Sequence, residues 1–535
     1  MDRRSFLGAG LGAGLANGLG TGFAGGLAAP ALGQDARAGT MRFVPQANLS
    51  SLDPVWTTAT VTSNHGYYVF DTLYAMDAGN RPRPQMAEGH ETLEDGRLWR
   101  FRLREGLRFH DNTPVRSADC IASIKRWCQR DPFGQLLARA VAEWRAIDDR
   151  GFEARLHRPF PLILDALAKP DASVCFIMPE RLASTEATRA ITEMVGSGPY
   201  RFLPGEYNSG SRVVYEKFDG YVPRQEAPER ASGGKVAHLR RIEWLVIPDA
   251  STAAAALTNG EVDWWERPLS DLRSVLSRNR EIRQEILDVE GRMALMRLNC
   301  LQPPFDDVRL RRAVRLSVMQ ENYMRAAQGD DAALWSECRS LYPRRTPYYK
   351  DNPDLMPGSL DAARAALRDA GYSNGKAVII NPTDFPDIGP LGQVTNDALR
   401  RVGMNVELAE SDWGTVIQRR NSREPVERGG WSIFHTTGSA NTYGSPAMSP
   451  LIRGQGEAGW FGWWKSDRAE QMTAEWIDAP DDATRMRLAE AIGRLALDEV
   501  ATIPLGQFTI RTAFRRNLTG MLEGSTPYPW NIRRA

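Results

Sequence analysis

The chain has few of the residues that build compact catalytic or metal-binding motifs. Its 535 residues include six histidines and five cysteines, and both kinds are scattered along the sequence. It has no HExxH zinc motif, no GxSxG nucleophile motif, no glycine-rich phosphate-binding loop and no paired-cysteine motif. We therefore expect no catalytic residue, no metal site and no cofactor, and we predict that the protein is not an enzyme.

The chain also lacks a charge imbalance and, after residue 40, a long apolar run. Its 67 basic and 66 acidic residues leave a net charge of +1, which gives no electrostatic reason to bind nucleic acid or an anionic membrane. No apolar run approaches the ~20 residues of a membrane-spanning helix. A chain of 535 residues is too long for one hydrophobic core, so we expect two or more lobes.

The five cysteines cannot all pair with one another within one chain. Cys120 and Cys128 fall within one predicted helix, about 12 Å apart at ~1.5 Å per residue, which is too far for a disulfide. A bridge between Cys300 and Cys338 stays open as an alternative to free thiols. No cysteine spacing predicts a zinc site.

The N-terminal segment reads as an export signal. The run Asp2-Arg3-Arg4-Ser5-Phe6-Leu7 resembles a twin-arginine motif, and a weakly hydrophobic segment rich in Gly, Ala and Leu follows it to about Gly33. The alternative is a hydrophobic membrane anchor, but the many glycines and Pro30 make a poor spanning helix. We predict that residues 1–33 are removed and that the mature protein is periplasmic.

The most informative stretch of the chain runs from Trp99 to Trp127. Apolar residues at 99, 101 and 103 alternate with arginines at 100, 102 and 104, which is the period of a half-buried strand. Leu107 and Phe109 resume the strand pattern, and residues 110–114 have the composition of a turn. Ser117 is the expected N-cap of a following helix.

This stretch closely resembles a signature of the extracellular solute-binding proteins of the peptide and nickel importer family. There a strand "L-R-x-G-x-x-F-x-x-G-x-P" precedes a helix that opens "A-x-D-V". In this chain Asn112 replaces the usual Gly, Ser117 the usual Ala and Cys120 the usual Val, whereas Asp119 is kept.

Further landmarks of the same family follow in the family's order. They are Leu52-Asp53-Pro54, Pro84 to Glu88, Gly196 to Tyr200, Pro248 to Asp263, Asn299 to Arg309 and Asp369 to Tyr372. Each is weak alone, but together they span nearly all of the chain after the signal, so the resemblance is strong.

The resemblance implies an α/β fold: a two-lobed periplasmic binding protein of type II (cluster C, three subdomains) with a hinge and an interlobe ligand cleft. We expect a discontinuous first lobe of residues 40–90, 195–295 and 505–535. An inserted subdomain would span residues 91–194, and the second lobe residues 296–504. The family also implies a monomer.

The resemblance implies two ligand-binding regions. The first follows the Leu52-Asp53-Pro54 turn, where Trp56, Thr58 and Thr60 suit an extended ligand approaching the backbone. The alternative is a surface loop that caps the next helix. The second region is the end of a strand and the turn after it, within residues 431–443, with His435, Thr437, Ser439 and Asn441 as candidates.

Peptide-binding members often carry an Asp near the Ser439 position, where it pairs with the free α-amine of the ligand. Here Ser439, Ala440 and Asn441 are all neutral. Neutral groups do not compensate the desolvation of an ammonium as a carboxylate does. We therefore hypothesise that the protein does not recognise a free peptide N-terminus in the usual way.

A tryptophan cluster is the third candidate feature. Three of the 15 tryptophans lie within residues 460–464, and such a cluster offers flat amphipathic surface to sugars, apolar side chains or cations. We expect Trp460 and Trp463 to line the cleft and Trp464 to pack in the core. A Trp-rich packing patch is the alternative for all three.

We predict the periplasmic substrate-binding protein of an ABC importer, which captures a peptide-like solute and delivers it to permease and ATPase subunits. A binding protein for an oligosaccharide, an opine or a modified peptide is an alternative. An exported enzyme, or a sensory or chaperone protein on the same scaffold, is an alternative of another class.

Overall fold

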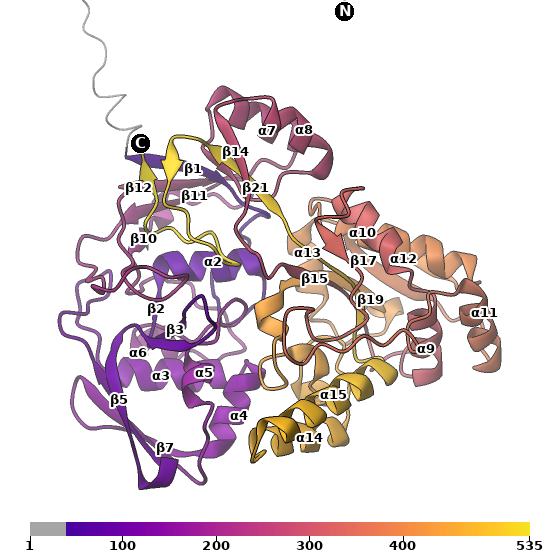
Figure 1. Ribbon diagram of the computed structural model, residues 1–535, viewed down its shortest axis with the longest axis horizontal. Helices are drawn as coiled ribbons and strands as arrows, with labels where there is room; N and C mark the ends of the chain where they lie inside the picture. Colours follow the sequence, from indigo (N-terminus) through magenta and orange to yellow (C-terminus); the bar gives the residue numbers. More distant parts are fainter. Residues whose placement is uncertain (1–38) are drawn as a thin grey trace, which may run out of the picture. The chain divides into compact units, whose positions relative to one another are not determined.

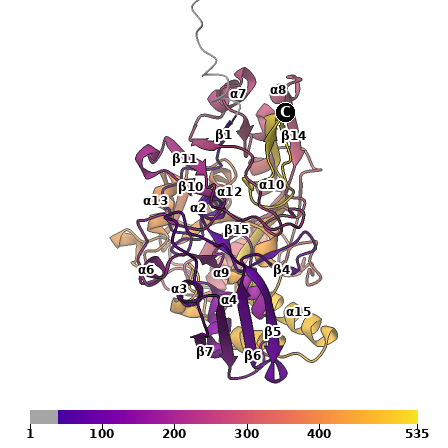
Figure 2. The ribbon, with the colours of Figure 1, turned by 90° about the vertical axis from the view of Figure 1, so that its left-hand side faces the viewer.

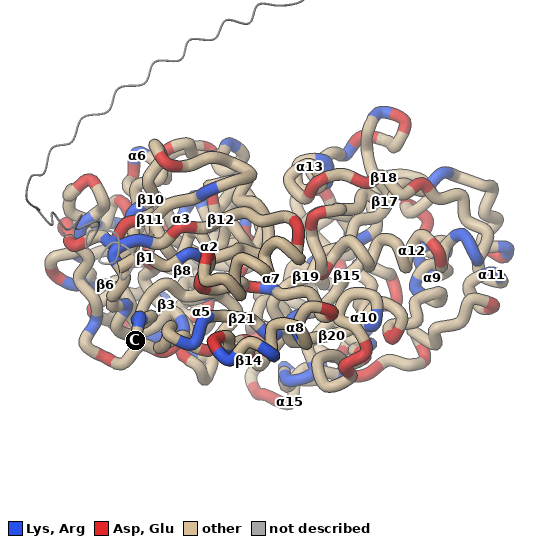
Figure 3. The backbone as a smooth tube through the Cα atoms, turned by 90° about the horizontal axis from the view of Figure 1, so that it is seen from above, with Lys and Arg blue, Asp and Glu red and all other residues tan. Residues whose placement is uncertain are grey.

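The computed structural model describes residues 39–535, and Figure 1 labels its elements. The predicted export signal, residues 1–33, lies outside the described residues. Within residues 39–535 no helix is both long and apolar enough to cross a membrane. Acidic and basic residues are interspersed along the backbone (Figure 3), in keeping with the net charge of +1.

A seven-stranded sheet forms the centre of the first lobe. Its order is β10 (Tyr200–Phe202), β11 (Arg212–Lys217), β12 (Arg241–Leu245), β1 (Thr40–Val44), β13 (Trp264–Trp265), β21 (Arg511–Arg515) and β14 (Ile282–Ile286). β1 pairs in parallel with β12 and β13, and the other pairs are antiparallel. The sheet thus brings together strands from the start, the middle and the end of the chain.

Helices and smaller strands complete the first lobe. They are α2 (Thr60–Val69), α7 (Ala250–Asn259), α8 (Arg273–Ser277), β2 (Asp71–Thr72), β3 (Tyr74–Met76), β4 (Pro82–Pro84), β9 (Phe176–Ile177), β22 (Leu518–Thr519) and β23 (Arg533–Arg534). The aromatic rings of Phe43, Tyr68 and Trp244 pack together in its core. Strand-forming aromatic residues of β1 and β12 thereby hold the parallel pair together.

A six-stranded sheet forms the centre of the second lobe. Its order is β16 (Trp335–Ser336), β20 (Ile503–Phe508), β15 (Arg292–Leu298), β19 (Ile433–Ser439), β17 (Ala377–Pro382) and β18 (Val406–Ser411). Its helices are α9 (Val308–Leu316), α10 (Gln320–Gln328), α11 (Leu360–Asp369), α12 (Gly389–Arg401), α13 (Trp413–Arg419), α14 (Asp467–Ile477) and α15 (Asp482–Asp498). Every residue of β15 is buried, as its continuous apolar run at 293–296 predicts.

Two short connections join the sheets of the two lobes. Residues 287–291 lead from β14 to β15, and residues 509–510 lead from β20 back to β21. The two connections lie against each other, because a Cβ at Gly291 would come 2.5 Å from the carbonyl oxygen of Phe508. Gly291 also has a positive φ of 75°, so this crossing requires glycine.

A four-stranded antiparallel sheet lies within the region between β4 and β10. Its order is β5 (Ala87–Leu93), β6 (Leu98–Leu103), β8 (Gly151–Leu156) and β7 (Val141–Ala146), and Figure 2 shows β5, β6 and β7 together. Its helices are α3 (Ser117–Cys128), α4 (Pro132–Ala140), α5 (Ile163–Leu167) and α6 (Glu180–Ala183). The expected boundaries of the two lobes and the inserted subdomain stay a prediction.

The signature stretch folds largely as its pattern predicts. In β6 the apolar residues at 99, 101 and 103 are buried, and the arginines at 100 and 102 are exposed. The prediction that Leu107 and Phe109 resume the strand is wrong, since only one isolated bridge, Arg108 to Pro114, forms there. Asn112 has a positive φ of 67°, a conformation that asparagine tolerates in place of the family's glycine.

The predicted cap of α3 is wrong by one residue. The N-cap is Arg116, whose backbone N–H donates to the carboxylate of Asp119 at 2.8 Å, and Ser117 is the first helical residue. The hydroxyl of Ser117 instead donates to the carbonyl of Asp148, which ties the helix to the β7–β8 turn.

Side chains cap the starts of three other helices. Asp249, Asp307 and Ser359 are the N-caps of α7, α9 and α11, and each side chain accepts a hydrogen bond from a backbone N–H in the first turn. Gly260 ends α7 in the left-handed region, with a φ of 74°.

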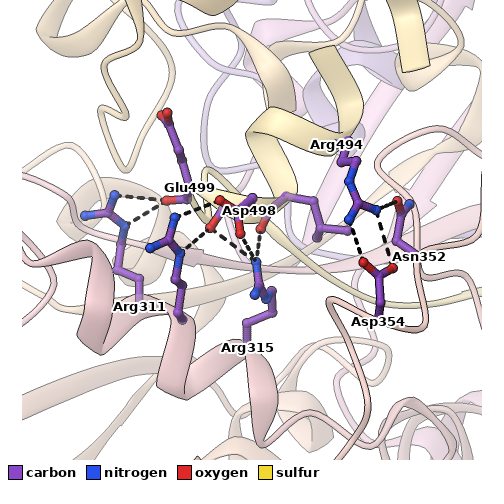
Figure 4. Close-up of polar contacts among 9 residues, drawn as sticks. Arg311, Arg315, Asn352, Asp354, Arg494, Asp498 and Glu499 are labelled. Atoms are coloured by element: carbon purple, nitrogen blue, oxygen red, sulfur yellow. Dashed lines mark hydrogen bonds and ion pairs between the residues drawn. The ribbon is translucent and has the colours of Figure 1, made fainter. Parts of the chain in front are cut away.

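Arginines of α9 hold the C-terminus of α15 (Figure 4). Arg311 donates to the carbonyl of Glu499, and Arg315 donates to the carbonyl of Leu497 at 2.7 Å. Arg494 pairs with Asp354 on the neighbouring loop. Because a helix C-terminus has unpaired carbonyls and a partial negative charge, these cations stabilise the packing of α15 on α9.

All five cysteines lie in the described part of the chain, and all are free thiols. The bridge between Cys300 and Cys338 that the sequence left open is therefore not formed. Cys120 and Cys128 both lie on α3, as expected, and both are buried.

Candidate ligand-binding site

A cavity of about 210 Å³ lies where segments of both lobes meet. The first lobe contributes residues within 55–60, just before α2, and the inserted region contributes residues within 129–132 and 169–173. The second lobe contributes residues 436–439 at the end of β19, together with residues within 420–423 and 455–463. The cavity is therefore assembled from segments far apart in sequence, which is the arrangement of an interlobe ligand site.

The loop before α2 is fixed by a buried carboxylate. Asp53 accepts hydrogen bonds from the backbone N–H groups of Val55, Trp56 and Ile191. It also forms a two-pronged ion pair with Arg126 on α3, with N–O distances of 3.2 and 2.7 Å. The Asp of the Leu52-Asp53-Pro54 landmark thus positions the binding loop and joins it to the inserted region.

The end of β19 brings hydroxyl groups to the cavity. The Ser439 hydroxyl accepts from the backbone N–H of Asn441 at 3.3 Å and so caps the short 3₁₀ helix of residues 440–443. The Thr437 hydroxyl is buried and, among the described residues, has no hydrogen-bond partner. It is therefore available to a ligand, since a buried polar group left unpaired is costly.

The tryptophan cluster divides between the cavity and the core. Trp460 and Trp463 line the cavity, and the indole N–H of Trp460 lies 3.5 Å from the Thr58 hydroxyl. Trp463 packs against Trp431, with ring centroids 5.6 Å apart. Trp464 does not line the cavity; it is buried, and its indole N–H donates to Glu499 at 3.1 Å.

Seven of the nine candidate residues lie around this one cavity. They are Trp56, Thr58, Thr60, Thr437, Ser439, Trp460 and Trp463. His435 does not line it, because this part of β19 is covered by α12 and the imidazole Nε2 lies 2.7 Å from the hydroxyl of Thr395. Asn441 lines a neighbouring cavity on the other side of the 3₁₀ helix instead.

Burial sets the protonation of His435. Desolvation lowers the pKa of the imidazole to about 3, so the side chain is neutral at physiological pH. His435 therefore belongs to the core beneath the site and orients β19. Within residues 39–535 no group of three or more His, Cys, Asp or Glu side chains could hold a metal ion.

Sequence reasoning missed the charged groups of the cavity. Asp171 contributes a carboxylate from a loop of the inserted region, with hydrogen bonds from Ser525 and from Thr442 at 3.4 Å. Arg292 at the start of β15 and Arg420 after α13 contribute buried guanidinium groups. The cavity is therefore lined by charged groups, although residues 439–441 are neutral. No local pattern marks these three residues, because they meet only in the folded chain.

Hydrogen bonds also join the two sides of the cavity. Arg420 donates to the Thr58 hydroxyl and Arg292 to the Thr60 hydroxyl, both at 3.3 Å. Arg267, which follows β13, forms an ion pair of 2.9 Å with Asp387, which precedes α12. The second lobe is thus in direct contact with the binding loop of the first.

Comparison with known proteins identifies the family. The model of the bacterial extracellular solute-binding proteins, family 5, matches residues 81–460. The chain belongs to this family. A probable peptide ABC transporter periplasmic-binding protein, y4tO of Sinorhizobium fredii, is 35% identical over 493 residues and is covered to 92%, with 91% of this chain matched. The glutathione-binding protein GsiB of Escherichia coli is 24% identical, over 89% of this chain and 90% of its own length.

Solved structures share the fold of this solute-binding protein. DppA of Helicobacter pylori, in complex with the peptide STSA, has a TM-score of 0.77 at 18% identity, over 93% of this chain and 98% of its own. AgaA of A. tumefaciens R10, in complex with agropinic acid, also has a TM-score of 0.77, at 19% identity, over 93% of this chain and 99% of its own. The fold is thus the two-lobed type II periplasmic binding fold. The protein is the substrate-binding component of an ABC importer, whose family works with permease and ATPase components.

Proposed function

We propose that this solute-binding protein captures a small peptide-like solute in the 210 Å³ cavity between its lobes and delivers it to its permease. The observation that carries the proposal is the convergence of seven candidate residues, from segments up to about 400 positions apart in the chain, on one cavity. The name of the relative at 35% identity supports a peptide-like ligand.

The volume favours a short solute. Ligand sites for drug-sized molecules usually enclose ~300–1,000 Å³, and this cavity is smaller. A dipeptide, or a conjugate of similar size, matches the space better than a long extended peptide. An opine or a modified peptide is a second candidate solute. The reason is that neutral Ser439 stands near the position where peptide-binding members often carry the Asp that pairs with the α-amine of the ligand.

The remaining parts of the proposal concern export and partners. The protein would leave the cytoplasm through the twin-arginine-type signal of residues 1–33, act as a monomer and release its solute unchanged. Replacement of Arg3 and Arg4 by lysine would then retain the precursor in the cytoplasm. A precursor that is exported at the normal rate would refute the twin-arginine route.

Identification of the bound solute tests the main proposal. The protein is purified from the periplasm of its host without denaturation, and the released small molecules are identified by mass spectrometry. Calorimetry with dipeptides and their N-acetylated forms then measures whether the free α-amine matters. We expect binding of a small peptide-like solute that acetylation weakens little. Chemical turnover of the solute by the protein alone would favour an enzyme instead.

A further inference from the structure

Among the described residues, two buried arginines of the cavity form no direct ion pair. The side chains of Arg292 and Arg420 are 4% and 2% exposed, and both line the cavity. In the part of the chain that the structure describes, neither guanidinium lies within ion-pair distance of a carboxylate. Asp171, Asp288 and Asp387 act on the Arg292 guanidinium only from beyond that distance. A buried charge without a direct partner is unfavourable, so a binding partner for it is expected.

Most of the donor capacity of these arginines is unused. A guanidinium carries five N–H groups. Among the described residues, Arg420 makes one hydrogen bond, from Nη2 to the Thr58 hydroxyl. Nη2 of Arg292 donates to the Thr60 hydroxyl and to the carbonyl of Thr437, both at 3.3 Å. Nε of each arginine is buried without a partner in residues 39–535.

Arg297 is a buried arginine whose side chain has a structural role. It is equally buried and also lacks a carboxylate, but it does not line the cavity. Its Nε donates to the carbonyl of Phe461 at 2.8 Å, and its Nη1 donates to the carbonyl of Ala501 and the hydroxyl of Thr502 at 2.5 Å each. Unlike these donors, the Nε groups of the two cavity arginines have no partner among the described residues and are available to a ligand in the cavity.

Aromatic rings hold Arg420 in place. Its guanidinium carbon lies 4.5 Å from the ring centroid of Phe461, 5.9 Å from that of Trp413 and 6.0 Å from that of Phe434. Stacking on these rings restricts the side chain while its in-plane N–H groups stay free to donate. Arg420 is therefore preorganised as an anion-binding group.

The other charges of the cavity do not neutralise the pair. Lys169 forms a buried ion pair of 2.6 Å with Asp131, and Arg423 forms an exposed ion pair of 3.2 Å with Glu457. Asp171 is then the remaining carboxylate among the cavity-lining residues, against Arg130, Arg292 and Arg420. The cavity therefore has an excess of positive charge.

We propose that the solute is a net-negative organic acid of peptide-like size, with a carboxylate that binds the free N–H groups of Arg292 and Arg420. This inference rests on the proposed function and narrows its ligand class. An acidic dipeptide, or an amino-acid conjugate with more carboxylates than amines, satisfies it. Desolvation lowers the pKa of both guanidinium groups to about 10, so both remain charged at neutral pH.

Matched probes test the charge requirement. Thermal shift and calorimetry compare the dipeptides Ala-Glu, Ala-Gln and Ala-Lys, glutarate and inorganic phosphate, together with the co-purified solute and its methyl ester. We expect the acidic dipeptide to bind at least tenfold more tightly than its amide or lysine counterpart, and esterification of the co-purified solute to cost at least tenfold. A neutral solute that binds as tightly, or phosphate that binds as tightly as the carboxylates, would overturn the inference.

Variants separate a ligand role from a structural one. Arg420→Met and Arg292→Met should each lower affinity for the acid at least tenfold. Ligand-free Arg420→Met should unfold at an equal or higher urea concentration, since it removes a buried charge that forms no ion pair among the described residues. Arg428→Gln, at an exposed arginine paired with Glu424, is the control and should change neither. Unchanged affinity in both methionine variants refutes the inference. Absence of any bound solute would refute the proposed function itself. If a methionine variant fails to fold, Arg420→Lys and the comparison of the solute with its methyl ester test the same role.

Discussion

Replacement of Asp53 by asparagine tests how the binding loop is held. Asp53 is fully buried, and both of its oxygens accept from the guanidinium of Arg126, which is 1% exposed. Asparagine has one acceptor oxygen, so its NH₂ group would face either Arg126 or the backbone N–H groups that Asp53 now binds. The substitution leaves the Arg126 charge uncompensated inside the protein.

The magnitude follows from burial. Breaking a buried, hydrogen-bonded ion pair by removing one partner costs about 3–5 kcal/mol. We expect Asp53→Asn to lower the free energy of unfolding by that amount in urea denaturation, and to weaken solute binding because the N–H groups of Val55 and Trp56 lose their anchor. Asp53→Asn combined with Arg126→Met should cost less than the sum of the single changes, because no charge is then left unpaired.

An exposed pair gives the control. Asp397 lies 3.6 Å from Arg401, and both side chains are more than half exposed, so Asp397→Asn should cost less than about 0.5 kcal/mol. The reasoning fails if Asp53→Asn costs less than about 1 kcal/mol, or if the control costs as much. In either case the loop would be held by its apolar contacts and not by the carboxylate.

Three further substitutions and one chemical test follow from the structure. Desolvation, assisted by the nearby Asp171, raises the pKa of Asp288 to about 6, so the free energy of unfolding falls as the pH rises from about 4 to 6. The Asp288→Asn variant lacks this loss. Between pH 4 and pH 7, its free energy of unfolding in urea should therefore rise relative to that of the parent by on the order of 2 kcal/mol. Burial lowers the pKa of His435, so its neutral form contributes stability that is lost as the pH falls below the pKa of about 6.5 that the imidazole has in the unfolded chain. Between pH 7 and pH 5, the free energy of unfolding should therefore fall by about 2 kcal/mol less in His435→Gln than in the parent. A Cβ at Gly438 would collide with the Tyr443 hydroxyl, so Gly438→Ala should cost about 1–3 kcal/mol and weaken binding in calorimetry. The five thiols should react slowly with a thiol reagent in the native protein and count as five after denaturation, and a count of three would reveal a disulfide.

Many of the helices and strands could be inferred from local patterns in the sequence. The alternation of β6, the N-caps at Asp249, Asp307 and Ser359, and the buried run of β15 each depend on neighbours within a few residues. Such interactions can be inferred from spacing, because strand and helix periodicity fix which side chains share a face. The cap of α3 could not be inferred in this way, since a contact with the distant β7–β8 turn decides it.

In the candidate site too, motifs indicated some of the residues, and only the fold brought the others together. Motif order led to the loop at residues 55–60 and to the end of β19, but it also favoured His435, which the packing of α12 removes from the cavity. Asp171, Arg292 and Arg420 carry no local signature, because each is an ordinary charged residue until the chain buries it. Only the fold brings them to a shared cavity, where neither arginine forms a direct ion pair among the described residues.

The family, the α/β elements and most of the predicted segments that line the cavity could be inferred from the sequence, because ordered motifs and residue spacing record local structure. Only the tertiary structure decided which charged groups line the cavity, since segments from three parts of the chain meet there. Burial leaves two arginines with unpaired donors at the cavity and makes one histidine a core residue, and no linear pattern encodes burial of that kind.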